Sequence, residues 1–129
     1  MAFTLSISTN PFVNRYADPD DLIDTIAAQI GIRDIQLTHE FINPGWPAEL
    51  IASMTRRFQK ALARTGVRST SMMTGPYGRL NHFGHPDKEV RRYYLDWFKT
   101  LCSISSDLGS PSVGTQFAIF THRDYDDPV

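Results

Sequence analysis

The segment DPDDLIDTIAAQIGIRDIQLTHE, residues 18–40, joins a helix signal directly to a strand signal. The leading Asp18-Pro19 pair has the chemistry of a helix N-cap and first turn, and Gly31 is a typical residue at a helix end. Between them, apolar residues recur at the spacing of one helical face. Residues 32–38 then alternate between apolar and polar, which predicts a strand that ends at a His-Glu pair.

The same pattern repeats along the rest of the chain. Further strands are predicted at residues 3–8, 67–74 and 112–120, and further helices at 47–65 and 87–109. Successive strands start 29, 35 and 45 residues apart. An alternation of strands and helices at this spacing is typical of a parallel sheet in an α/β protein.

Composition narrows the class of protein. The 129 residues, with 41% hydrophobic and 21% charged side chains, suit one globular domain over residues 1–129. No stretch approaches the roughly 20 apolar residues that span a bilayer, and the first residues do not resemble a signal peptide. With a net charge of −1, the chain lacks the positive electrostatic field that attracts a protein to nucleic acid. We therefore expect a cytoplasmic chain with neither a membrane nor a nucleic-acid partner.

Right-handed crossovers leave two architectures for such a chain. One is an open, doubly wound sheet of flavodoxin type, and the other is part of a (β/α)8 barrel. An aspartate at 126 or 127 before Pro128 repeats the Asp-Pro signal, as if another helix were about to begin. A full barrel takes about 250 residues, so four strands favour the first half of one. Helices on a single face of the sheet, with the other face apolar and unpaired, would support the half barrel.

Four segments resemble the xylose-isomerase-like family of sugar isomerases and epimerases. They are SISTNP (6–11), IRDIQLTHEF (32–41), GPYGRLNHFGHPDKEVRRYY (75–94) and LGSPSVGTQ (108–116). Within that family, the chain is most similar to tetrulose-phosphate (erythrulose phosphate) isomerases or epimerases. The resemblance implies an enzyme that moves a proton next to the carbonyl of a ketose or ketose phosphate.

The resemblance also implies a divalent metal, Mn²⁺, Mg²⁺ or Zn²⁺, held by two Glu, one Asp and one His that lie mostly on later strands. No Glu occurs after Glu89, so no metal ligand and no catalytic carboxylate can be carried over to this chain. We therefore expect the isolated chain to be inactive and the full-length form to be the enzyme.

The candidate substrate-binding residues lie where the predicted strands end, because the active site of a parallel barrel is at that edge. They are Asn10, His39, Glu40, Arg79, His82 and Gln116. His39 or Glu40 could hydrogen-bond sugar hydroxyls or move a proton, but adjacent strand residues point to opposite faces, so at most one should face the pocket. Arg79 could contact a phosphate or be a solvated loop residue. Gln116, polar within an apolar strand, should line the site or brace a ligand.

Three further expectations concern structure. Cys102 should be a small buried side chain on the apolar face of the third helix, and His85 should cap or staple the start of that helix. The uncovered strand edges and inner face of a half barrel should drive association into a homo-oligomer, which leaves a self-associating structural fragment as an alternative to an enzyme part. A non-catalytic, flavodoxin-like ligand-binding module is the other alternative.

Overall fold

The computed structural model describes residues 4–75 and 82–116 of the chain. Within them, four parallel strands form one sheet in the order β1-β2-β3-β4. The strands are β1 (Ser6–Ser8), β2 (Asp34–Thr38), β3 (Arg68–Met73) and β4 (Val113–Gly114). The helices are α1 (Pro19–Asp24), α2 (Ala48–Thr65) and α3 (Lys88–Asp107), with a π-helix, η2 (Thr25–Ile30), and two 3-10 turns, η1 (Asn10–Phe12) and η3 (His39–Phe41). The predicted alternation of strands and helices is confirmed.

The helix starts are those that the capping residues predict. The Asp18 carboxylate accepts a hydrogen bond of 2.9 Å from the backbone N–H of Asp20. The Asp87 carboxylate does the same for Glu89 at 2.8 Å. Each satisfies one of the backbone donors that a helix start leaves unpaired. The imidazole of His85 accepts a hydrogen bond of 3.1 Å from the backbone N–H of Asp87, so this histidine braces the start of α3 as expected.

The end of the first helix differs from the prediction. Residues 25–30 form a π-helix, and the N–H of Gly31 bonds to the carbonyl of Ile26, five residues back, at 2.9 Å. The wider turn rotates the following side chains around the helix axis. Ile30, predicted on the buried face with Ile26, is therefore 39% exposed, whereas Ile26 is fully buried.

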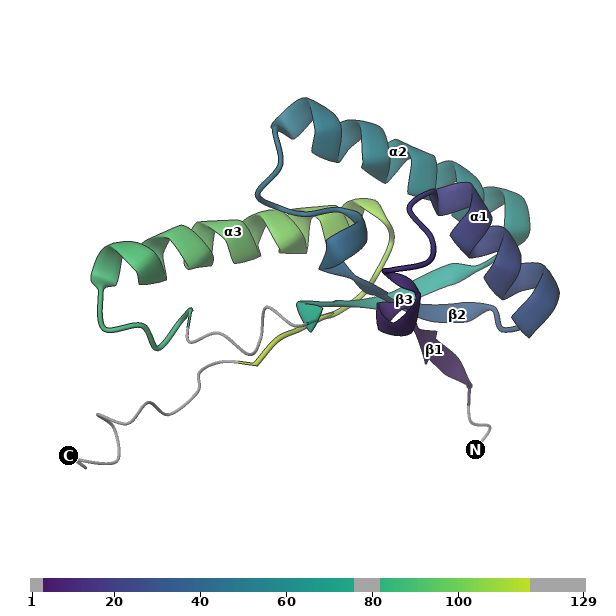
Figure 1. Ribbon diagram of the computed structural model, residues 1–129, viewed down its shortest axis with the longest axis horizontal. Coiled ribbons are helices and arrows are strands. Elements are labelled where there is room, and N and C mark those ends of the chain that lie inside the picture. Colours follow the sequence, from purple (N-terminus) through teal and green to yellow (C-terminus); the bar gives the residue numbers. More distant parts are fainter. Residues whose placement is uncertain (1–3, 76–81, 117–129) are drawn as a thin grey trace.

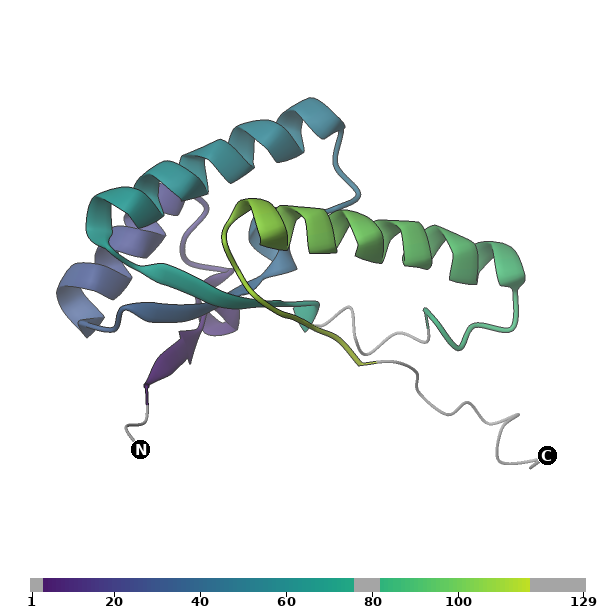
Figure 2. The ribbon, with the colours of Figure 1, turned by 180° about the vertical axis from the view of Figure 1, so that it is seen from behind.

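All three α-helices lie on the same face of the sheet, as the front and back views agree (Figures 1 and 2). The core fills the layer between them and the strands: Ile35, Leu37 and Met72 are fully buried, and so are Leu22 and Leu101 on the helices. A doubly wound sheet carries helices on both faces. The flavodoxin-like alternative is therefore wrong for the described residues, and the chain folds as part of a (β/α)8 barrel.

The opposite face of the sheet is polar, where an apolar one was expected of a half barrel. Because β1 and β2 pair Ile7 with Ile35 on the helix side, Ser6, Ser8 and Gln36 fall on the open side. The hydroxyls there bind across strands: Ser6 Oγ lies 3.5 Å from the Thr70 hydroxyl, and Ser8 Oγ donates to the Met73 sulfur at 3.6 Å. These bonds partly satisfy polar groups on a face that no described helix covers.

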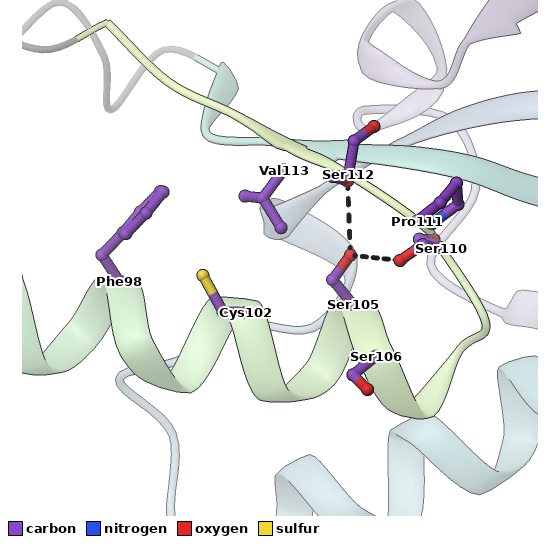
Figure 3. Close-up of a pocket in the computed structure, with 8 residues that line it drawn as sticks. All are labelled: Phe98, Cys102, Ser105, Ser106, Ser110, Pro111, Ser112 and Val113. Atoms are coloured by element: carbon purple, nitrogen blue, oxygen red, sulfur yellow. Dashed lines mark hydrogen bonds between the residues drawn. The ribbon is translucent and has the colours of Figure 1, made fainter.

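The last strand also differs from its prediction. β4 comprises Val113–Gly114, whereas the predicted strand ran over residues 112–120; positions 117–120 and the Asp-Pro signal near the end lie outside the described residues. Cys102, expected to be buried, is an exposed free thiol. It lies on the flank of α3 that faces β4, where none of the described helices packs against it (Figure 3). Within the described part of the chain, no helix is long and apolar enough to cross a membrane.

Candidate functional site

A row of threonines marks the carboxyl-terminal edge of the sheet. Thr9, Thr38, Thr74 and Thr115 each end a strand or directly follow one. The backbone N–H of Thr38 donates to the Thr9 hydroxyl at 3.0 Å, and the hydroxyls of Thr74 and Thr115 lie 3.1 Å apart. The first three residues are buried. Their hydrogen bonds tie the strand ends together in pairs and give the edge a fixed polar floor.

Glu40 lies over this floor, between the ends of β2 and β3. The Thr38 hydroxyl donates a hydrogen bond to Glu40 Oε2. Gly75, which follows β3 with a φ of +51°, approaches from the other side. A Cβ at this position would lie 2.8 Å from both Glu40 Oε2 and Thr38 Oγ1, closer than van der Waals contact permits. A residue without a side chain is therefore needed for the carboxylate to occupy this place.

His39 lies apart from Glu40, within the packed layer. It is fully buried, and its ring contacts the indole of Trp97 on α3 edge to face, with 5.2 Å between ring centres. Burial lowers the pKa of His39 below its ordinary value of 6.5, and the charge of Glu40 and the backbone of Met73 oppose that shift only in part. The imidazole is thus held neutral at pH 7, and Glu40 is the member of the pair at the strand-end edge.

The other four predicted site residues have different positions. Asn10 begins η1 at the end of β1, where it is half-buried and its N–H donates to Ser8 Oγ at 3.4 Å. His82 stacks on Tyr94 of α3, with ring centres 3.5 Å apart. Gln116 is exposed beyond β4, so the expectation that it sits within an apolar strand is wrong. Arg79 lies outside the described residues.

Trp97 organises the loop that follows η3. Its indole N–H donates to the Asn43 side-chain oxygen at 3.3 Å, and the same oxygen accepts the backbone N–H of Gly45 at 2.8 Å. The same indole therefore contacts both His39 and the turn beyond it. α3 begins beyond the strand ends and runs back along the sheet (Figure 1), so the helix passes over the carboxyl-terminal edge of the strands.

The strand-end threonines, Gly75 and Trp97 were not predicted as site residues. Each threonine in isolation resembles a loop residue, and the tryptophan looks like ordinary core. The one signal available was positional: superposing the strand ends of the four units would have placed a threonine at the same point in each, in the segments SISTN, IQLTH, MMTGP and VGTQF.

The donor set tests whether the chain could hold a divalent metal by itself. No group of three His, Cys, Asp or Glu side chains among residues 4–75 and 82–116 could hold a metal ion. At the strand-end edge, Glu40 is engaged by Thr38 and His39 is packed against Trp97. The described residues therefore do not form a metal site on their own.

One-sided helices on a parallel sheet define a partial (β/α)8 barrel, and the candidate site lies at the carboxyl-terminal edge of its strands. A crystal structure of a protein assigned as a xylose isomerase, from Rhodospirillum rubrum, has this fold: it superposes with a TM-score of 0.89 over 98% of this chain and 43% of its own, at 22% sequence identity. No protein-family model matches the chain.

Sequence comparison points to a particular relative. The chain is 68% identical, over all of its 129 residues, to D-erythrulose 1-phosphate 3-epimerase of Brucella abortus (strain 2308). The match covers 42% of that relative, so the chain spans less than half the length of the curated protein that it resembles. The resemblance predicted from the sequence segments is confirmed by these two matches.

Proposed function

We propose that this chain is the portion with the first four strands of a ketose-phosphate 3-epimerase that acts on D-erythrulose 1-phosphate or a closely similar tetrulose phosphate. The observation that carries the proposal is the 68% identity, which extends over the complete chain and includes every residue of the strand-end edge within its span. At the substrate level, the reaction inverts the carbon next to the ketone. Because a phosphate ester is charged and does not cross a bilayer unaided, we propose a cytoplasmic location.

The chemistry requires no oxidant or second substrate. The C–H bond at carbon 3 breaks, its proton passes to a base, and its electron pair forms an enediolate with the carbonyl oxygen at carbon 2. Return of a proton to the opposite face of carbon 3 restores the ketone with inverted configuration. In the proposal, carboxylates outside this chain exchange the proton. Glu40, which this chain places beside Thr38 and Gly75, binds the substrate instead.

Within this scheme, the chain's own residues bind and orient the substrate. Glu40, held by Thr38 on a rigid polar floor, accepts a hydrogen bond from a substrate hydroxyl. Asn10 offers an amide at the end of β1, and His82 adds an imidazole near the start of α3. His39 stays neutral and buried, so its part is to support the Glu40 turn from behind. Arg79 is proposed to contact the phosphate.

A divalent metal remains part of the proposal for the complete enzyme, with its ligands supplied from outside this chain. When bound, such an ion would polarise the ketone oxygen. The described residues do not form its site, and none of the roles above depends on it.

In the absence of the remaining barrel, the open sheet edges favour a homo-oligomer of the isolated chain.

A chimera tests the proposed activity. This chain would replace the matching segment of the Brucella relative, and D-erythrulose 1-phosphate would be incubated with the chimera in D₂O. Loss of the carbon-3 proton signal in NMR, together with formation of the opposite enantiomer, is the expected result. A chimera that folds with a cooperative thermal transition but neither exchanges the proton nor inverts the centre would contradict the proposal.

The same chimera tests Glu40. Glu40→Gln keeps the shape and removes the charge, and should lower kcat/KM by about 10²-fold or more, because a charge-assisted hydrogen bond at an active site is worth roughly 1.5–3 kcal/mol and its loss also misplaces the substrate. Glu49→Gln, on the exposed first turn of α2, is the matched control and should leave kcat/KM unchanged. Equal activity of the two variants would remove Glu40 from the site.

A further inference from the structure

Met73 ends β3 on the open face of the sheet. The register pairs it with Thr38, whose hydroxyl donates to Glu40 at the strand-end edge. The preceding Met72 pairs with Leu37, and both are fully buried on the helix side, whereas Met73 is half-buried. Successive residues of a strand point to opposite faces. Met72 therefore belongs to the core, and the side chain of Met73 faces the interior of the barrel.

The side chain of Met73 crosses β2 to reach β1. Ser8 Oγ donates to Met73 Sδ at 3.6 Å, although β2 lies between the strands that carry these two residues. Neighbouring strands are about 4.8 Å apart, so β1 and β3 are about 10 Å apart, and the thioether must lie along the face of β2 to close that distance. Gln36, the partner of Ser8 in β2, is on the same face. Met73 thus covers the middle strand just inside the strand-end edge.

Two contacts hold Met73 in this position. The backbone of Met73 is hydrogen-bonded to the buried His39 imidazole. At the other end of the residue, the Ser8 hydroxyl that donates to the sulfur also accepts the backbone N–H of Asn10 at 3.4 Å. Glu40 follows His39 directly in the chain. The contacts therefore join Met73 to Asn10 and Glu40, which the proposed function places around the substrate.

The chemistry around the Met73 sulfur suits the uncharged end of a ketose phosphate. A phosphate dianion is bound most strongly by cationic side chains. The described side chains at this point, Ser8, Gln36 and Met73, are uncharged, and the Ser8 hydroxyl is already engaged on both sides. The Glu40 carboxylate at the edge would also repel a phosphate. In a tetrulose 1-phosphate that reacts at carbon 3, the uncharged end is carbon 4 with its hydroxyl.

We propose that Met73 is a specificity-determining residue that closes the substrate pocket beneath carbon 4 and thereby limits the substrate to four-carbon ketose phosphates. This inference rests on the proposed function and assigns its substrate length to one side chain. A longer ketose phosphate places a further CHOH unit where the thioether lies. That unit must either displace Met73 from its two contacts or bury a hydroxyl against a sulfur that donates no hydrogen bond and accepts one only weakly.

The selectivity of the chimera between two substrates tests this role. D-Ribulose 1-phosphate has the same configuration at carbon 3 as D-erythrulose 1-phosphate and one more CHOH unit beyond it. Exchange of the carbon-3 proton in D₂O would be measured for both. Met73→Ala removes the side chain beyond Cβ and should raise the ratio of kcat/KM for the five-carbon over the four-carbon substrate by about tenfold or more. Both values come from one preparation, so their ratio does not depend on the fraction that is folded.

Two variants serve as controls. Met73→Leu keeps most of the volume of the side chain and should leave the ratio nearly unchanged. Met54→Ala makes the same truncation on α2, where Met54 packs against the core on the helix side of the sheet, and should also leave the ratio unchanged. If Met73→Ala does not fold, Met73→Val carries the same test, because it removes less of the side chain and suits a strand.

The outcomes separate this inference from the function on which it rests. A chimera that does not act on D-erythrulose 1-phosphate would overturn both. A chimera that acts on it, but whose selectivity is the same in Met73→Ala, would overturn the role of Met73 alone. The same holds if the unsubstituted chimera accepts both substrates equally well, if a folded Met73→Ala acts on neither, or if Met54→Ala produces a similar gain. A gain confined to the truncation of Met73 would support the proposal.

Discussion

The two faces of the sheet differ in polarity and in what covers them. On the helix side, Ile35, Leu37 and Met72 are fully buried against α1, α2 and α3, whereas the opposite side carries Ser6, Gln36 and Thr70 and has no helix over it in the described part of the chain. Adjacent residues of one strand thus belong to different environments. The difference shows that the described residues bury one face of the sheet against helices and leave the other face polar and open.

The largest effect should come from breaking the covered face. Leu37→Ala removes a fully buried side chain and should lower the free energy of unfolding by about 2–5 kcal/mol. Gln36→Ala, one residue earlier on the open face, should change it by about 0.5 kcal/mol or less. Urea titrations of the two variants test the pair, and similar losses would mean that both faces are packed.

A second comparison concerns the strand-end edge. Gly75→Ala and Gly66→Ala both place a side chain at positive φ, at +51° and +72°, but only the first would meet Glu40 and Thr38 at 2.8 Å, and the second would meet nothing within 4 Å. Each change should cost about 1–2 kcal/mol for the backbone alone. Gly75→Ala should lower the unfolding free energy further and should raise KM in the chimera, because Glu40 must move. Indistinguishable variants would show that the Glu40 position is loose.

A smaller effect should appear as a dependence on pH. His39 has a folded-state pKa below the 6.5 of the unfolded chain, so the unfolded state binds more protons as the pH falls below about 6.5. The free energy of unfolding should therefore decrease with acidification from that pH downward. His39→Gln should flatten this part of the profile in urea titrations at a series of pH values. A wild-type profile that is flat between pH 6.5 and 5 would contradict the burial of a neutral imidazole.

The smallest effect is expected on the outer surface, where the helices of the covered face contact one another. Arg64 of α2 bonds the carboxylates of Asp20 and Asp24 at 2.8 and 2.6 Å, with about half of each side chain exposed. Exposed pairs contribute little and are screened by salt. Arg64→Ala should therefore lower the thermal midpoint only slightly in low salt, and the difference from wild type should vanish in 1 M NaCl. A large loss that persists in high salt would mean that Arg64 holds α1 mainly through packing of its aliphatic stem and not through charge.

Local signals predicted the order of the elements, because they reside in neighbouring residues. Asp18 and Asp87 cap their helices whatever lies around them, and the alternation over residues 32–38 needs only one buried face. Features set by distant packing were missed. Ile30 is turned outward by a π-helical turn, and Cys102 is exposed because burial on that flank of α3 would require a neighbour outside the described residues.

For the candidate site too, positions set by local signals were predicted, and features set by distant packing were not. The strand-end rule located Asn10, His39 and Glu40 correctly at the edge of the sheet, since it depends only on strand direction. It could not show that His39 turns into the packed layer against Trp97, or that Gly75 makes room for Glu40. Both facts depend on how α3 and the end of β3 approach the edge, which the spacing of residues within one strand does not encode.

Thiol labelling of the two sheet faces tests the one-sided architecture most directly. In a chain carrying Cys102→Ser, Gln36→Cys and Leu37→Cys would be compared under native conditions, at a concentration where light scattering reports a monomer. The account predicts rapid reaction at position 36 and protection at position 37. Equal protection at both positions would mean that a second layer covers the open face, and the description of this chain as part of a ring would be wrong.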